Sequence, residues 1–308
     1  MFCIKFDIAF LIKHTSCGFP TEFGSIHQNS TGSSTPVDKT DIYHSGAGRI
    51  TPVFMRPMSL WESKESEGKV SLASLFEKKL DFNWEFNPPK AMDHIAFLLC
   101  RGGWPISVTV NQEIALDVTK NYYNSLFVFE ESENERFRNK KPEVIKMILK
   151  SYARNISSEA SVSTIISDVR QSNERSMDVK TFNEYLEAIK DIFIIEDLQA
   201  WNPSIRSKTS IRSTPTRHFV DTSIACRALN ISPNELLNDL ESFGLFFEDF
   251  VVRDLRIYAN YLGGEVRHYR DNSGLECDAI ILLEDGRSVN INCNMIQQEC
   301  LTEARHSC

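Results

Sequence analysis

Residues 142–154, PEVIKMILKSYAR, carry the clearest helical pattern in the chain. Pro142 suits the first turn of a helix, where its missing N–H costs no hydrogen bond. Val144, Ile148 and Tyr152 then follow at four-residue spacing, which places them on one face of the helix. This amphipathic pattern predicts a helix that buries one side against its neighbours.

The segments that follow extend this helix into a recognisable unit. Two more amphipathic helices are expected, over residues 162–169 and 179–192. Strand-like runs come next, at 193–198 and 218–220, and they flank a loop that contains several basic residues. Helix, helix, helix, strand, basic loop and strand is the order of a winged helix-turn-helix, which we assign to residues 140–222.

On the C-terminal side, the sequence pattern predicts helices followed by strands. A short helix is expected from Pro233, capped by Ser232, and a longer one over residues 245–262. Gly263 and Gly264 end the longer helix. Three strand candidates with intervening turns follow, at 265–270, 277–283 and 288–294. A helix that packs on a three-stranded meander is an α/β core, which we assign to residues 232–294.

On the N-terminal side we expect helices over residues 70–79, 90–100 and 112–125. Gly102 and Gly103 lie where the second of these helices needs a C-terminal cap. The stretch 130–141 is almost wholly polar or charged and is typical of a linker. Residues 1–45 show no sustained periodicity and are expected to be loop.

Composition restricts the class of protein. The 308 residues are 42% hydrophobic and carry a formal net charge of −8, so the chain as a whole has no electrostatic attraction to nucleic acid or anionic membranes. No apolar run approaches the roughly 20 residues that span a bilayer. The eight cysteines are scattered, without metal-binding spacing. These features predict a soluble, cytoplasmic protein of two or three compact units.

Three N-terminal motifs suggest a family. They are TGSSTP at 31–36, SGAGRI at 45–50 and MRPMSLWE at 55–62. Together they resemble prokaryotic AAA-type P-loop ATP-binding proteins that carry the C-terminal domain of unknown function 4143. The resemblance continues through CRGGWP, SYARN, AWNP and RHFVD, at 100–105, 151–155, 200–203 and 217–221, and covers about residues 30–294.

The resemblance implies a mixed α/β architecture of three parts. Residues 29–130 would be a remnant of the AAA ATPase core with its helical lid, 140–222 the winged helix, and 232–294 a restriction-endonuclease-like core. Residues 1–28 and 295–308 match nothing in that family. The chain would then be an N-terminally truncated family member.

Within the family, the small polar turn and the Gly-Arg motif lie near the ATP phosphates. By resemblance, Ser33 or Ser34 would sense phosphate and Arg49 would act as an arginine finger. The alternative is that the serines form an ordinary turn and Arg49 is a surface residue. No Gly-x-x-x-x-Gly-Lys-Ser/Thr loop occurs in the sequence. We therefore expect no cofactor for this chain alone, although the intact family uses ATP and magnesium.

The winged helix is a candidate DNA-binding unit. Residues 140–217 contain 13 Lys and Arg against 10 Asp and Glu, in contrast to the acidic remainder. Phosphate contacts would come from Arg206, Lys208, Arg212 and Arg217. Glu184 and Glu187 on the expected recognition helix oppose DNA, and winged helices also bind proteins. Both partners stay open at this point.

The C-terminal core resembles a nuclease that has lost its site. By resemblance, Glu248 takes the helix position of the metal site and Asp278 the strand position. Where the family has Glu-x-Lys on the next strand, this chain has Asn292 and Asn294. Two neutral amides supply neither the carboxylate charge that magnesium prefers nor the lysine that steadies the attacking water. We predict a degenerate site without cleavage.

One further pair invites a catalytic interpretation. His218 and Asp221 are three residues apart, but no nucleophile lies in a recognisable elbow, so we assign them a structural role. The favoured function is DNA or protein binding by a family member that no longer catalyses. The alternatives are a subunit that supplies Arg49 in trans to a partner's ATP site, and a metal-dependent nuclease. Expected partners are DNA, an intact family homologue or a second copy of this chain, and no membrane.

Overall fold

The computed structural model describes residues 54–68, 70–77, 92–127, 137, 140–171, 177–202, 214–271 and 276–293. It also describes the backbone of strand β1 (Phe6–Asp7), which pairs in parallel with β2 (Val70–Ser71). All statements about the structure below refer to these residues.

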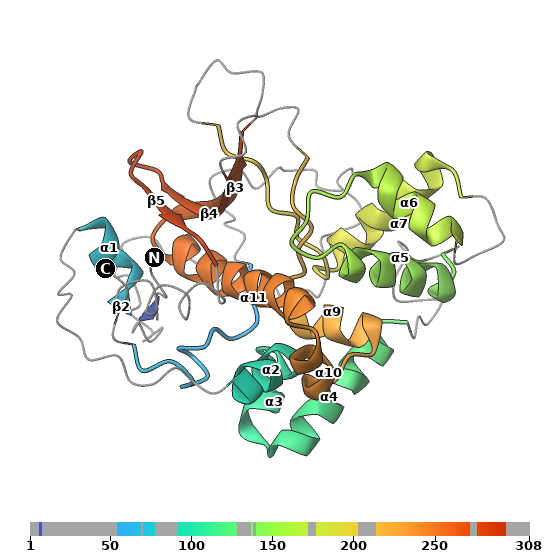
Figure 1. The fold of residues 1–308 in the computed structure, drawn as a ribbon, viewed down its shortest axis with the longest axis horizontal. Coiled ribbons are helices and arrows are strands. Elements are labelled where there is room, and N and C mark those ends of the chain that lie inside the picture. The colour runs from blue at the N-terminus through green and yellow to red at the C-terminus, as the bar shows by residue number, and fades with distance from the viewer. Residues whose placement is uncertain are drawn as a thin grey trace, which may run out of the picture.

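One long helix, α11 (Leu240–Tyr261), runs through the middle of the molecule (Figure 1). Asp239 caps its N-terminus by accepting a hydrogen bond from the Ser242 amide. Phe243, Phe246 and Phe250, from its first half, belong to a large, mainly helical core. Residues of its second half belong to a smaller core that includes the sheet. The helix therefore joins two hydrophobic cores, which we call the helical core and the sheet core.

The helical core collects most of the other helices. In Figure 1 they lie below and to the right of α11. They are α2 (Met92–Arg101), α4 (Gln112–Ser125), α5 (Pro142–Arg154), α6 (Val162–Gln171), α7 (Val179–Asp191), α9 (Thr222–Leu229) and α10 (Pro233–Asn238), with the short α3 (Pro105–Thr109) between α2 and α4. One hydrophobic cluster contains side chains from both the 92–127 and the 140–250 regions. Packing thus crosses the stretch that was expected to be a linker.

Two extended stretches follow α7 and pair with each other. Ile195 pairs with Phe219 and Leu198 with Thr216, both antiparallel. The amide of Glu196 also donates to the carbonyl of His218 at 3.0 Å. The three helices α5, α6 and α7 and this strand pair occur in the predicted order, and we call them the helix–hairpin unit.

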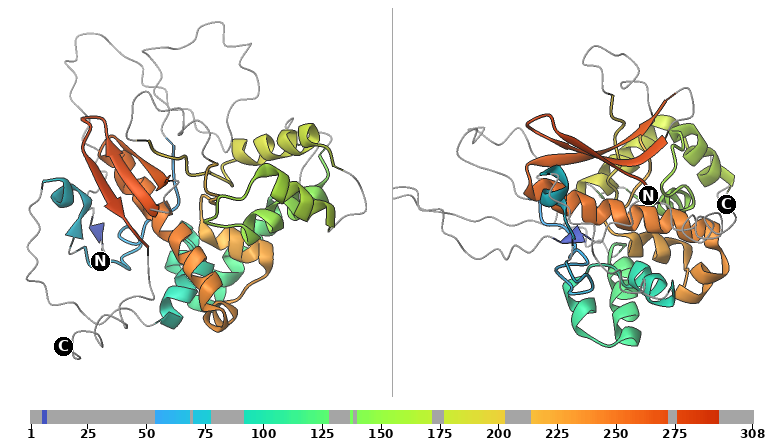
Figure 2. Two further views of the ribbon diagram at one scale, coloured as in Figure 1. Left: turned by 45° about the horizontal axis from the view of Figure 1, so that its top comes forward. Right: turned by 60° about the vertical axis from the view of Figure 1, so that its left-hand side comes forward.

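The sheet core contains the antiparallel sheet β3 (Gly264–Arg270), β4 (Glu276–Leu283) and β5 (Ser288–Ile291), in that spatial order. Val266 pairs with Ile281, and Ala279 with Ile291. All four pack with Leu255 and other residues of α11 and with α1 (Leu72–Phe76), so α11 covers one face of the sheet (Figure 2).

The hairpin and the sheet are connected through the backbone. Ala200 forms a parallel bridge with His268 on β3. The Trp201 amide donates to the His268 carbonyl at 2.7 Å, and the His268 amide donates to the Gln199 carbonyl at 3.0 Å. The helix–hairpin unit is therefore attached directly to the edge of the sheet.

The mixed helical and sheet composition that the sequence predicted is confirmed. The predicted helix over 112–125 coincides with α4, and the three predicted C-terminal strands correspond to β3, β4 and β5. Helix α9 was missed. The finer assignments to an ATPase remnant, a winged helix and a nuclease-like core stay proposals.

Candidate functional site

Several predicted site residues lie outside the described ranges. They are Ser33, Ser34, Arg49, Arg206, Lys208, Arg212 and Asn294. Their roles stay predictions. The remaining ones, Arg217, Glu248, Asp278 and Asn292, are described below, beginning with the buried polar groups around them.

A tight approach of three chain segments occurs at Gly102 and Gly103, directly after α2. Gly102 has a φ of +71°, and a Cβ added there would lie 2.3 Å from Asp221 Oδ1. A Cβ added at Gly103 would lie 2.3 Å from the Met58 carbonyl oxygen. The Gly103 amide donates to Asp221 Oδ2 at 2.8 Å, and the Met58 amide donates to the Gly103 carbonyl at 2.7 Å. Only glycine permits this contact, because any side chain would occupy the space of the neighbouring segment.

Arg253 of α11 binds the same carboxylate. Its Nη1 donates to Asp221 Oδ2 at 3.0 Å, while Nε and Nη2 donate to Asp254 Oδ1 at 2.9 and 2.7 Å. Asp254 Oδ2 in turn accepts the Leu60 amide at 2.8 Å. Arg253 is 2% exposed, so its burial alone would lower its pKa, yet the two carboxylates raise that pKa above the usual range. These ion pairs hold residues 58–60, the α2 terminus, the start of α9 and the middle of α11 together.

A second buried cluster centres on Asp249. Its Oδ1 lies 2.9 Å from His218 Nδ1 and accepts the Phe219 amide at 3.0 Å, and its Oδ2 accepts the Thr222 hydroxyl at 2.7 Å. The other ring nitrogen of His218 contacts Thr216. Both nitrogens of His218 are thus occupied by residues other than Asp221, and the ring is fully buried. These contacts support the structural role assigned to His218 and Asp221.

The structure corrects the role expected for Arg217. This side chain is 3% exposed. Its Nη1 donates to Asp197 Oδ2 at 3.0 Å and to the Tyr152 hydroxyl at 3.2 Å, and its Nε donates to the Ala160 carbonyl at 2.9 Å. Tyr152 also forms a very short hydrogen bond with Asp197. A buried guanidinium whose hydrogen bonds are used inside the fold cannot contact a DNA phosphate.

The predicted nuclease positions include two carboxylates with perturbed pKa values. They are Glu248 on α11 and Asp278 on β4. Burial raises the pKa of Glu248 well above its ordinary value, and the charges of Asp278, Asp249 and Glu276 raise it further. Burial likewise raises the pKa of Asp278, although the Cys293 amide, which donates to its Oδ2 at 2.5 Å, acts against this. Burial and neighbouring carboxylates therefore act in the same direction on the pKa of Glu248.

These residues do not fit a magnesium ion well. Asn292, at the position of the lost glutamate, is exposed and neutral. One oxygen of Asp278 already accepts a backbone hydrogen bond. Within the described part of the chain, no three His, Cys, Asp or Glu side chains are grouped to hold a metal ion. Magnesium relies on carboxylate charge, and here an amide stands at one expected carboxylate position while a backbone N–H occupies an oxygen of another.

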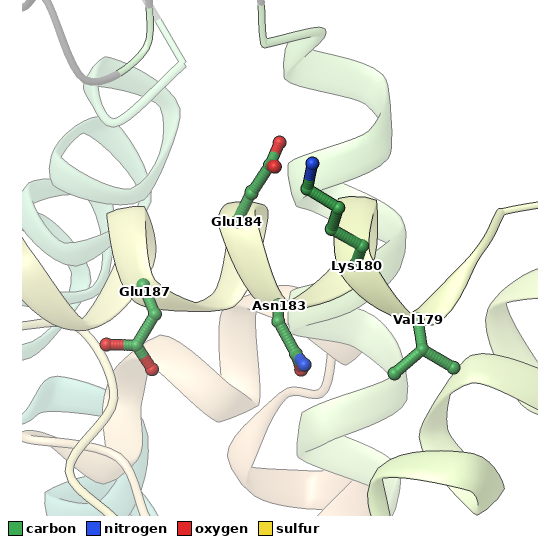
Figure 3. Close-up of a pocket in the computed structure, with 5 residues that line it drawn as sticks. All are labelled: Val179, Lys180, Asn183, Glu184 and Glu187. Atoms are coloured by element: carbon green, nitrogen blue, oxygen red, sulfur yellow. The ribbon is translucent and has the colours of Figure 1, made fainter.

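The exposed face of α7 is a different kind of surface. A hollow of about 670 Å³ opens on it, and the described residues that line it all belong to α7 (Figure 3). They are Val179, Lys180, Asn183, Glu184 and Glu187. The opposite face of α7, with Phe182, Tyr185, Leu186 and Ile189, is buried in the helical core. The fold therefore presents the polar side of α7 outward.

Sequence reasoning missed the buried polar centre. The helical pattern over residues 245–262 gave no indication that Asp249, Arg253 and Asp254 have buried partners, because such a pattern does not reveal which distant segment supplies a partner. One signal was available for α9. Asp221 is a favourable N-cap residue, and Asn230, with a φ of 57°, is a favourable residue after the helix end.

Part of the chain matches the model of a known domain family. Within the described residues, no helix is both long and apolar enough to cross a membrane. No curated protein and no solved structure matches the chain. Residues 92–235 match the family model of a domain of unknown function, DUF8612, which spans less than half of the 308 residues. The match contains the helix–hairpin unit and Asp221, and it ends before Arg253.

Proposed function

We propose that this chain is a binding protein whose helix–hairpin unit recognises a macromolecular partner, as a winged helix does. The observation that carries the proposal is the arrangement of α5, α6 and α7 followed by the antiparallel pairs Ile195–Phe219 and Leu198–Thr216. In a winged helix, the third helix and the hairpin present the contact surface. Here α7 occupies that place with a polar outer face.

The rest of the molecule supports this unit as a rigid platform. The Arg217–Asp197 pair fixes the hairpin to α5, since Tyr152 lies on that helix. Arg56 forms a two-pronged pair with Glu196 at 2.5 and 2.8 Å, and Arg256 donates to the Glu196 carbonyl at 2.8 Å. These contacts attach the hairpin to α11 and to the segment near residue 56. A recognition surface on such a platform loses little conformational entropy on binding.

The resemblance to AAA-type ATP-binding proteins adds a context. In that interpretation the helix–hairpin unit is the retained winged helix, and the sheet with α11 is a degenerate restriction-endonuclease-like core. A role for Arg49 at a partner's ATP site stays a prediction, tested by adding the chain to an intact relative and measuring ATP hydrolysis before and after Arg49→Ala.

A second candidate function, metal-dependent DNA cleavage, is favoured by one observation. Glu248 has a raised pKa beside Asp278, and perturbed carboxylates are common at catalytic sites. The exposed, neutral Asn292, at the position where the family has a glutamate, weighs against it. Supercoiled plasmid incubated with Mg²⁺ or Mn²⁺ should stay intact, whereas nicking that disappears in Asp278→Ala would establish the nuclease.

The binding proposal is tested by amide hydrogen exchange on the purified chain. We would add, separately, a random-sequence DNA duplex and a short amphipathic peptide of lysine and leucine. Binding by the proposed unit predicts slower exchange in α6, α7 or the 194–198 and 216–220 stretches with at least one probe. Protection confined to α3, α4 or β5, or no protection with either probe, would contradict the proposal.

A further inference from the structure

We propose that the exposed face of α7 binds a protein segment that carries lysine or arginine side chains around an apolar residue, and that it does not bind nucleic acid. This inference rests on the proposed function, because it names the partner class of the helix–hairpin unit. It follows from the accessibility, the charge and the capping of α7.

The face combines an apolar end with acidic positions. Val179, in the first turn, is 56% exposed, which is unusual for a valine and provides an apolar contact. Glu184 and Glu187 lie further along the helix and are both exposed. Figure 3 shows Lys180 and Glu184 on one side of the helix axis, and Val179, Asn183 and Glu187 on the other. A partner that crosses this hollow meets both carboxylates and the valine.

The charges of this face are only weakly neutralised from within. Glu187 lies 3.6 Å from Lys190, which also lies 3.3 Å from the buried Asp197, and the Glu187 side chain is 69% exposed. Lys180 is the single cation among the five residues that line the hollow. Cationic side chains of a partner therefore complement the surface, whereas a phosphate backbone would meet two carboxylates.

The N-terminus of α7 is closed to phosphate as well. Helix N-termini attract anions because their first amides lack intrahelical partners. Here Asp178 caps the helix, and its Oδ1 accepts the Thr181 amide at 2.7 Å. That hydrogen bond, with the further contacts to Thr181, lowers the pKa of Asp178, so the carboxylate stays charged at neutral pH. The amides that would receive a DNA phosphate already hold an anion.

Basic residues nearby do not restore a phosphate surface. Lys146, Lys150 and Arg154 follow one another at four-residue spacing on α5. Lys146 pairs with Glu143 at 3.0 Å, and Arg154 pairs with Asp168 at 2.5 Å. Two of the three charges are thus compensated by carboxylates, and all three lie on a different helix from the hollow.

Charge reversal on α7 tests the inference. Fluorescence anisotropy would measure binding of the lysine–leucine peptide, of a glutamate–leucine counterpart and of a random-sequence DNA duplex. The double variant Glu184→Lys/Glu187→Lys should weaken binding of the lysine–leucine peptide about tenfold or more. Val179→Asp should weaken it as well, because the apolar contact is lost. Neither change touches the helical core, and circular dichroism would verify that α7 is intact.

A matched control separates local from overall charge. Asp117→Lys/Glu284→Lys changes the net charge by the same amount at exposed positions on α4 and after β4. It should alter peptide binding less than about twofold. Equal weakening by both double variants would overturn the inference, since the peptide would then respond only to the net charge of the protein.

The DNA arm distinguishes this inference from the proposed function. Suppose that the wild-type chain binds the duplex, and that reversal at Glu184 and Glu187 changes duplex binding but not peptide binding. The helix–hairpin unit would then still be a recognition unit, but the inference that its partner is a protein segment would be wrong. If a probe binds but its binding does not depend on α7, only this inference falls. If neither probe binds the chain, both proposals fall. Peptide binding that depends on α7, together with no duplex binding, supports both.

Discussion

Two neighbouring carboxylates on α11, Glu248 and Asp249, meet opposite surroundings. Asp249 is fully buried and accepts hydrogen bonds from Thr222 and the Phe219 amide, with the His218 ring also in contact. Glu248 is partly exposed and faces Asp278 and Glu276, whose charges add to burial in raising its pKa. Two adjacent helix positions thus face, respectively, a group of like charges and a centre whose polar groups are hydrogen-bonded.

This difference indicates which of the two groups of charges stabilises the fold. Buried charges are tolerated only when each has a partner, and the centre around Asp249 and Arg253 meets that condition. It draws on segments that are far apart in sequence, near residues 60, 103, 221 and 250. By the same criterion, the carboxylates of Glu248 and Asp278 have fewer hydrogen-bond and ion-pair partners. We therefore interpret the first as scaffold, whereas in the second, burial and like charge both disfavour ionisation of Glu248.

Replacing Arg253 should lower the free energy of unfolding more than any other change considered below. Arg253→Met keeps much of the side-chain volume but leaves Asp221 and Asp254 buried without their cation. Breaking a buried ion pair in this way costs about 3–5 kcal/mol. Urea denaturation followed by circular dichroism measures the free energy of unfolding, and a loss below about 1 kcal/mol would contradict the importance of the network.

Arg267→Met is the matched control. Arg267 also forms a two-pronged pair, with Glu265, but on the partly exposed strand β3. Such a pair contributes less than about 1 kcal/mol because water competes for both charges. Equal losses for the two variants would show that burial does not decide the effect.

Gly102→Ala should give the next largest effect. The methyl group would lie 2.3 Å from Asp221 Oδ1, and the left-handed backbone adds strain. Overpacking of this kind costs about 1–3 kcal/mol. Gly244→Ala, in the interior of α11 with no atom within 4 Å of the new methyl, should instead stabilise the chain by about 0.5–1 kcal/mol. Thermal and urea denaturation would measure both, and a stable Gly102→Ala would show that this approach is not tight.

The sequence predicted the local elements better than their partners. The boundaries of α4, and those of β3 and β4 to within one residue, follow from caps, turns and periodicity, which are local signals, whereas β5 ends at Ile291 and not at the predicted residue 294. Helix α11 starts earlier than predicted because Asp239 caps it, although Leu240 and Leu245 are exposed and break the apolar pattern. Local signals of this kind fix where an element lies and leave open which distant segment it packs on.

Arg217 shows why the candidate site could not be predicted equally well. Its position near a basic loop indicated a phosphate contact. Its burial depends on Tyr152 and Asp197, which are 65 and 20 residues away in the chain. The same limit applies to Asp249. The pairing of Glu248 with Asp278, by contrast, was implied by the family resemblance, and the charge of Asp278 is among the causes that raise the pKa of Glu248.

Glu248→Gln should give the smallest effect, and one of opposite sign. Because the folded state raises the pKa of Glu248, it binds the proton more tightly than the unfolded chain does. Wild-type stability should therefore decline as the pH rises from the ordinary pKa of glutamate through the raised value, and the penalty then persists at neutral pH. Glutamine cannot ionise, so the variant should lose this decline and be slightly more stable than the wild type at pH 7.

Asp249→Asn, the neighbouring control, should be less stable than the wild type at the same pH, because an amide cannot accept all the hydrogen bonds that the carboxylate accepts. Urea denaturation between pH 4 and 8 measures both. If Mn²⁺ stabilised the wild type and not Glu248→Gln, the carboxylates would hold a cation, and the contrast between scaffold and degenerate site would have to be redrawn in favour of the nuclease.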